Sequence, residues 1–150
     1  MFIQPEIEKI LPPPREALGD YKVVSFSKGI GKISGQFPVV EANLISGVIG
    51  KDLTVDEAHK ASEMVALNII AQIHKIREKI NVTSLLHLDC YVQASITDKR
   101  LVEIINTLSK MLKKAFGKEG QHSRSLVIVN DLPLNATMEV VTTFTYDEKE

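Results

Sequence analysis

A stripe of apolar residues in the middle of the sequence constrains the fold more than any other feature. It begins after Thr54 and Glu57, which have the spacing of a capping box, in which a hydroxyl and a carboxylate each accept a hydrogen bond from a free backbone N–H group. Its members lie three or four residues apart, at Ala58, Ala61, Val65, Ile69, Ile73, Ile76 and Ile80. This spacing predicts a helix over residues 54–80 with an apolar face, which we expect to lie flat on a sheet.

A second helix and several strands are predicted around the first helix. Apolar residues recur at helical spacing from Leu101 to Ala115, and Gly117 follows where a C-terminal cap belongs. Alternating or β-branched residues predict strands at 21–26, 31–37, within 39–49, and at 86–92, 125–130 and 137–146. This order of elements favours a two-layer α/β sandwich, in which a mixed sheet carries both helices on one face.

The N-terminal segment differs in character from the rest of the chain. Pro12, Pro13 and Pro14 lack backbone N–H donors and hold φ at about −65°, so they favour an extended conformation over residues 1–18. The total length suits one core without a metal or disulfide, and we therefore expect a single domain over residues 1–150.

The predicted sheet has a second face that no predicted helix covers. Strand alternation places Glu139 and Val141 of the last strand there, together with His87, Asp89 and Tyr91 of the fourth strand. A face that mixes polar and apolar side chains can be solvated, but it also suits packing between subunits. We therefore expect an oligomer.

The charge balance excludes several classes of protein. The 18 Lys and Arg residues nearly balance the 19 Asp and Glu residues, so no global field attracts nucleic acid or an acidic membrane. No apolar run is long enough to span a bilayer, and Glu6 and Glu8 are atypical of a signal or transit peptide. We therefore expect a cytoplasmic protein that binds neither a membrane nor nucleic acid.

Cysteine and histidine do not form a pattern typical of a metal site. The four histidines lack HxxxH and HxxH spacings, and the single cysteine, Cys90, lies on the apolar side of a predicted strand. We interpret Cys90 as a buried structural thiol and expect no metal.

Four lysines gather near the end of the second predicted helix, at Lys110, Lys113, Lys114 and Lys118. Cations at this end suit the helix macrodipole, so we interpret them as a solvated face. An RNA-binding patch is the alternative, but no aromatic residues interleave with the lysines to stack on bases.

Arg124 is the most informative single residue. The chain has four arginines against fourteen lysines, and this arginine opens an apolar strand, Arg-Ser-Leu-Val-Ile-Val. A guanidinium among apolar side chains needs an anionic partner, because an unpaired charge there is costly. Glu139, fifteen residues further on, fits this role as an ion-pair partner, and a bound carboxylate fits it equally well. The residues alone leave both alternatives open.

Several segments between Leu11 and Phe144 occur together in a specific order and spacing. They are LPPPREALGDY, ISGQFPV, GKDLTVDEA, FGKEGQHSRSLVIVNDLP and ATMEVVTTF. In this order they resemble the YjgF/RidA family, also called the reactive imine deaminase or liver perchloric-acid-soluble (endoribonuclease L-PSP) family. The GQHSRS and LPPP segments look most like its longer YjgF-like branch.

The resemblance implies a chorismate-mutase-like fold and a homotrimer. In that fold the last strand is inserted into the middle of a six-stranded sheet of order 1-2-3-6-4-5. The sheets of three subunits pack around a barrel-like centre, and the substrate pockets lie in the clefts between subunits.

The resemblance also implies a reaction and a set of site residues. Family members hydrolyse 2-imino or 2-aminoacrylate-type acids to 2-keto acids and ammonia without a cofactor. By the family motif, Arg124 holds the substrate carboxylate and Glu139 orients the attacking water. Tyr21, Gly35 and Asn106 match further substrate-binding positions.

Leu126 stands where well-known deaminases often carry cysteine. This excludes a thiol at the position, although a backbone contact to substrate would remain. Two other functions are therefore considered beside deamination: a module that binds 2-keto acids without turnover, and the endoribonuclease or translation-inhibitor activity attributed to some family members. The charge of −1 makes RNA the weaker of these alternatives.

Overall fold

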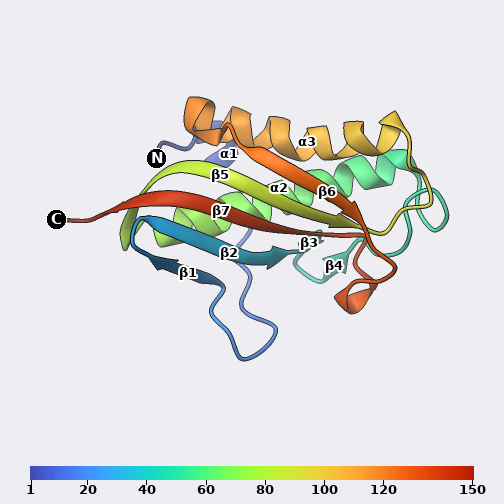
Figure 1. The fold of residues 1–150 in the computed structure, drawn as a ribbon, viewed down its shortest axis with the longest axis horizontal. Coiled ribbons are helices and arrows are strands. Elements are labelled where there is room, and N and C mark those ends of the chain that lie inside the picture. Colours follow the sequence, from blue (N-terminus) through green and yellow to red (C-terminus); the bar gives the residue numbers. More distant parts are fainter.

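Two long helices cover one face of a five-stranded sheet in the computed structural model, which describes residues 1–150 (Figure 1). The sheet contains β1 (Val24–Ser27), β2 (Ile30–Gln36), β5 (Ile80–Val92), β6 (Ser123–Ile128) and β7 (Met138–Glu148), and the helices are α2 (Val55–Ile76) and α3 (Lys99–Phe116). The short elements are β3 (Val39–Val40), β4 (Asn43–Leu44), α1 (Pro5–Glu8) and the 3₁₀ turns Gly117–Gly120 and Pro133–Asn135. The predicted two-layer sandwich is confirmed.

The last strand in the sequence lies at the centre of the sheet. The order is β1-β2-β7-β5-β6, and β7 pairs antiparallel with both β2 and β5. At one edge β6 runs parallel to β5, and at the other edge β1 runs antiparallel to β2. The sheet is therefore mixed, as predicted, with its final strand inserted in the middle.

The third predicted strand does not join this sheet, so the expected order 1-2-3-6-4-5 is wrong at that strand. Pro38 follows β2 and has no N–H to offer a strand ladder. Asn68 of α2 donates hydrogen bonds from Nδ2 to the backbone oxygens of Phe37 and Val39, at 2.9 and 2.7 Å. These bonds hold the segment against the helix, where β3 pairs only with β4.

The start of α2 and the end of α3 are as the sequence predicts. Glu57 N donates to Thr54 Oγ1 at 3.2 Å and Thr54 N donates to Glu57 Oε1 at 3.4 Å, which confirms the capping box. Gly117 ends α3 with a φ of 63°, a left-handed value that suits glycine. No helix of the chain has the length and apolar character of a membrane span.

The boundary between α2 and β5 differs from the prediction. The helix ends at Ile76, and Ile80 begins the next strand instead of extending the helical stripe. Ile80 and Val82 are buried on either side of exposed Asn81, which is the alternation of a strand. The first strand likewise starts at Val24, three residues later than expected.

The segment ahead of the prolines contains a short helix, although an extended conformation was expected there. Ile3 and Ile7 are buried, and Gln4 N donates a hydrogen bond to the backbone oxygen of Ala115 in α3, at 2.9 Å. Ile3, just before the helix, and Ile7 within it both pack into the core, and Pro5 suits the first helical position, which together explain why α1 forms there.

The core lies between the helices and one face of the sheet. Every second side chain of β5 and β7 enters it, including Leu88, Val140 and Phe144. Gly31 of β2 lies beneath Phe144, and a Cβ there would be 2.2 Å from the ring. The alternate side chains of these strands lie on the opposite face of the sheet, where they are half-buried, and no helix covers them.

The capping box gives a first prediction. Thr54→Ala removes the acceptor for Glu57 N, so we expect a loss of about 1 kcal/mol in the free energy of unfolding, measured by urea denaturation. Thr97→Ala is the matched control, because Thr97 is exposed and its hydroxyl makes no hydrogen bond. Equal losses in the two variants would contradict a capping role for Thr54.

Candidate functional site

Arg124 lies on β6 with its guanidinium held against α3. Its parallel neighbour is Leu88 of β5, so the side chain faces the helices. Nη1 donates to Ser109 Oγ at 2.8 Å, and Nη2 donates to Asn106 Oδ1 at 2.7 Å. Both acceptors are neutral, so the charge of Arg124 has no carboxylate partner within the chain.

Glu139 is not that partner, and the ion-pair alternative is wrong within one chain. Glu139 lies opposite Tyr91 on β5, three residues beyond the Leu88 that pairs with Arg124. Residues an odd number apart on a strand face opposite ways, so Glu139 lies on the face without helices. The spacing in sequence did not reveal this, because the two residues belong to strands on opposite sides of β5.

The guanidinium of Arg124 opens into a pocket between α3 and β6, which we call the basic pocket. It has a volume of about 530 Å³ and no hydrophobic lining residue. Its lining residues are Asn106, Ser109, Lys110, Lys113, Gln121, His122 and Arg124. The concave surface therefore combines several cations with neutral polar groups and contains no carboxylate.

His122 is held in one neutral tautomer at the wall of the basic pocket. Its Nδ1 lies 2.7 Å from the backbone oxygen of Gly120, which only accepts, so Nδ1 carries the proton. Nε2 then accepts a hydrogen bond from Ser109 Oγ at 2.9 Å, and Ser109 in turn accepts one from Arg124. Burial lowers the pKa of His122, and the nearby charges of Arg124, Lys113 and His87 lower it further, although the bond to Gly120 opposes this.

Glu139 lies against a glycine on the other face of the sheet. A Cβ on Gly35 would be 1.9 Å from Glu139 Oε1, so only glycine leaves room for the carboxylate in this position. No side chain or backbone group of the chain bonds to that carboxylate, and burial raises its pKa. It is therefore a better proton acceptor near neutral pH than an ordinary glutamate.

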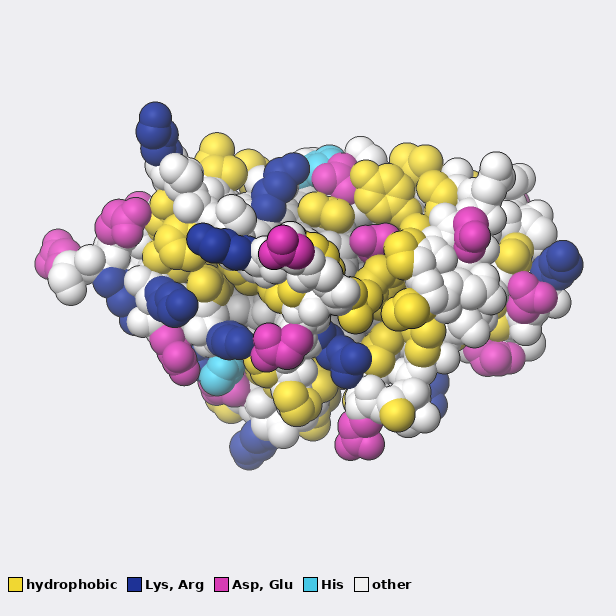
Figure 2. All heavy atoms as spheres, turned by 90° about the horizontal axis from the view of Figure 1, so that it is seen from below, with side chains coloured by type: hydrophobic (Ala, Val, Ile, Leu, Met, Phe, Trp, Pro, Cys, Tyr) yellow, Lys and Arg dark blue, Asp and Glu magenta, His cyan; other side chains and the backbone are white.

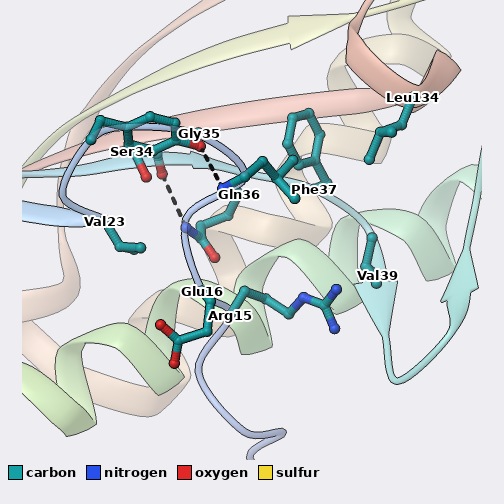
Figure 3. Close-up of a pocket in the computed structure, with 11 residues that line it drawn as sticks. Arg15, Glu16, Val23, Ser34, Gly35, Gln36, Phe37, Val39 and Leu134 are labelled. Carbon is teal, nitrogen blue, oxygen red and sulfur yellow. Dashed lines mark hydrogen bonds between the residues drawn. The ribbon is translucent and has the colours of Figure 1, made fainter.

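Gly35 also lines a second, small cavity of about 40 Å³, which we call the tyrosine pocket. Figure 3 shows its wall: Ser34, Gly35 and Gln36 at the end of β2 face Arg15 and Glu16 of the N-terminal segment. Tyr21 and Leu134 also line it. Gln36 is buried, and its Oε1 points toward the N-terminal segment without a hydrogen-bond partner.

The structure sorts the predicted site residues into two groups. Glu139 and Gly35 touch, and Gly35 and Tyr21 share the tyrosine pocket. Arg124 and Asn106 meet in the basic pocket, and Leu126 lies two residues along β6 on the same face as Arg124. Within one chain Arg124 and Glu139, one from each group, lie on opposite faces of the sheet.

Sequence reasoning missed Ser109 and His122. Both had a signal: Ser109 follows Asn106 by three residues on one helix face, and His122 precedes Arg124 by two residues on one strand side.

Apart from His122, no histidine lines either pocket, and Cys90 lines neither. Cys90 is fully buried in the core, and burial raises the pKa of its thiol to about 12. The structure contains no group of three or more His, Cys, Asp and Glu side chains that could hold a metal ion.

Charges of both signs are interspersed on the side of the molecule opposite α3. Figure 2 shows hydrophobic side chains in several groups across this side, with Lys, Arg, Asp and Glu lying among them. This surface therefore differs from the basic pocket, in which every charged side chain is a cation.

The raised pKa of Glu139 gives a second prediction, on stability. The native state holds the proton more tightly than the unfolded chain, so this contribution is present below the ordinary pKa of 4.5 and is lost as pH rises through the folded value. We expect Glu139→Gln to raise Tm at about pH 7 and to leave it near wild type at about pH 4. Glu148→Gln, at the exposed end of β7, is the control. An equal rise in Tm at both pH values would contradict the raised pKa of Glu139.

Comparisons with known proteins agree with this fold. Residues 7–146 match the family model described as "YjgF/chorismate mutase-like, putative endoribonuclease". Protein TCP17 of Trypanosoma cruzi is 30% identical over 111 residues, which cover 72% of this chain and 69% of TCP17.

Two solved structures have the same fold at higher coverage. A putative endoribonuclease from Shewanella oneidensis MR-1 is 28% identical with a TM-score of 0.81, covering 90% of this chain and 91% of that chain. Atu1372 from Agrobacterium tumefaciens, of unknown function, is 25% identical with a TM-score of 0.81, covering 94% and 90%. Because the family match spans nearly the whole sequence, the chain belongs to the YjgF/chorismate mutase-like family, as the resemblance of its motifs predicts.

Proposed function

We propose that the protein hydrolyses reactive 2-imino acids of the 2-aminoacrylate type to 2-keto acids and ammonia, at sites shared between neighbouring copies of the chain. The observation that carries the proposal is the state of Arg124. Two neutral acceptors hold its guanidinium in place, and no carboxylate of the chain neutralises it. The family includes enamine and imine deaminases, which act on small carboxylic acids of this kind.

Arg124 would bind the substrate carboxylate. A guanidinium has five N–H donors, and only two of them are used by Ser109 and Asn106. The remaining donors form a fork that matches a carboxylate in two parallel hydrogen bonds. Since the fork is already oriented by α3, little freedom is lost when the substrate binds.

Glu139 would activate the attacking water. Water adds to the carbon of the C=N bond and gives a proton to the carboxylate, which returns it to the nitrogen. In the resulting carbinolamine the hydroxyl proton passes through the same carboxylate to the nitrogen as the C–N bond breaks, which yields the keto acid and ammonia. Hydrolysis of an imine needs little more than positioning and one base, and burial has raised the pKa of Glu139 toward the working range of a base.

The arrangement of the two groups supports a site between copies. Arg124 lies on β6, an edge strand, and faces the helices, whereas Glu139 lies on the other face of the sheet against Gly35 of β2. A contact that joins two different surfaces of identical chains forms a ring when its rotation closes, and a trimer is the ring that the family resemblance implies. Val127 of β6 and Ile30 of β2 are exposed on the uncovered face and would be buried in such a contact.

The fold neighbours are consistent with a small-acid site. TdcF of E. coli, which is 17% identical with a TM-score of 0.66, has been solved with bound serine, an amino acid of similar size. An RNA substrate is less well supported, because no Phe, Tyr or Trp lines the basic pocket to stack on a base.

The proposal predicts that a subunit lacking Arg124 and a subunit lacking Glu139 restore activity when they assemble together. We expect Arg124→Ala and Glu139→Gln each to lower the rate of imine loss by about 100-fold or more, with 2-aminoacrylate generated in situ. In trimers assembled from an equal mixture of the two variants, about a quarter of the sites combine an intact Arg124 with an intact Glu139, so activity returns to that level.

The controls separate the possible failures. Wild-type activity without recovery in the mixture would overturn the shared site, because both residues would then act within one chain. Binding of 2-oxobutyrate without turnover by the wild-type protein would favour the non-catalytic binding module. A protein that neither binds this acid nor consumes the imine would contradict both functions.

A further inference from the structure

We propose that the basic pocket beside Arg124 selects substrates with a second anionic group, so that the preferred substrate is a short dianion rather than a three-carbon monocarboxylate. The inference rests on the proposed function for the first carboxylate, which Arg124 binds. The second group, a carboxylate or a phosphate, would lie between Lys110 and Lys113.

The first argument is the charge of the pocket walls. Arg124, Lys110 and Lys113 are cations, His122 is neutral in the tautomer that its hydrogen bonds impose, and no Asp or Glu lines the pocket. The whole chain carries a net charge of −1, so this local excess does not follow from composition. Cations that face one another in a concave site repel, and a bound dianion relieves that repulsion.

The second argument is that neither lysine has a partner in the chain. Lys114, on the adjacent side of α3, lies 4.0 Å from Glu6 of α1. Lys99, at the start of the helix, lies 3.8 Å from Glu103. Lys110 and Lys113 form no such pair, although surface lysines on this helix otherwise have carboxylates within reach.

The third argument is the spacing along α3. Asn106, Lys110 and Lys113 follow one another at four and three residues, which places them on one face of the helix. With a rise of about 1.5 Å per residue, Lys110 lies about 6 Å and Lys113 about 10 Å along the axis from Asn106, which orients Arg124. A second anionic group a few carbons from the first would therefore meet the lysine ammonium groups.

The fourth argument is the size and polarity of the pocket. A volume of about 530 Å³ exceeds what a three-carbon acid fills, and the absence of any hydrophobic lining residue gives an aliphatic side chain nothing to pack against. Arg124 fixes the direction of the first carboxylate, whereas flexible lysines accept a second anion over a range of lengths. The pocket therefore favours charge at the far end of the substrate and not an alkyl group.

The test compares three keto acids by isothermal titration calorimetry at low ionic strength: 2-oxobutyrate, 2-oxoglutarate and phosphonopyruvate. We expect the wild-type protein to bind at least one of the two dianions about tenfold more tightly than 2-oxobutyrate. The tighter of the two identifies the second group as a carboxylate or a phosphate-type anion. In Lys110→Gln/Lys113→Gln the ratio of the affinities for the better dianion and for 2-oxobutyrate should fall to within about twofold.

Lys114→Gln/Lys118→Gln is the matched control. It removes two lysines from the same end of α3 and the turn that follows and changes the net charge equally, and neither lysine lines the basic pocket. The control should keep the tenfold preference, and loss of the preference there would assign it to the general field of the protein and overturn the proposal.

The remaining outcomes separate this inference from the proposed function. Equal binding of all three acids by the wild-type protein, with 2-aminoacrylate still consumed, would overturn the second anionic group and leave the deaminase intact. A preference that survives in Lys110→Gln/Lys113→Gln would also overturn it. Failure to bind any of the acids, together with failure to consume the imine, would contradict both proposals.

Discussion

The pairing of β7 with two neighbours at once is the interaction on which the rest of the structure depends. Because β7 lies between β2 and β5, it joins the hairpin at one edge to the parallel pair at the other. Its register decides which side chains enter the core and which face away from the helices. Val140 and Phe144 enter the core, whereas Glu139, the residue before Val140, is directed onto the uncovered face beside Gly35. The candidate base is thus placed by the same hydrogen bonds that close the sheet.

Local patterns predicted the helices and the faces of the strands, because both depend on neighbours in the sequence. The capping box forms at Thr54, where α2 begins, and Gly117 adopts a left-handed φ where α3 ends. The third strand could not be predicted in this way. Its residues have strand-forming character. However, Asn68, far away in sequence, occupies the backbone oxygens of Phe37 and Val39, which would otherwise accept hydrogen bonds from a neighbouring strand. A tertiary hydrogen bond overrode local propensity there.

The candidate site was predicted as a set of residues, and its arrangement was not. The positions of Arg124 and Glu139 in the sequence left an ion pair and a bound carboxylate equally open. Which face of the sheet each side chain lies on depends on the registers of three strands. Those registers follow from bulges and pairings that no local pattern reveals. The lysines of α3 were interpreted as a solvated face for a similar reason. Only the packing of α3 against β6 shows that Lys110 and Lys113 share a hollow with Arg124.

The place of β7 in the chain also bears on synthesis. The hairpin β1–β2 and the pair β5–β6 do not pair with each other as strands, so the sheet cannot close until residues up to Glu148 have left the ribosome. During that interval the nascent chain presents unpaired strand edges beside apolar helices, which is the condition in which chains associate wrongly and chaperones bind. Translation speed over the final turn and strand would therefore set how long each new copy stays exposed.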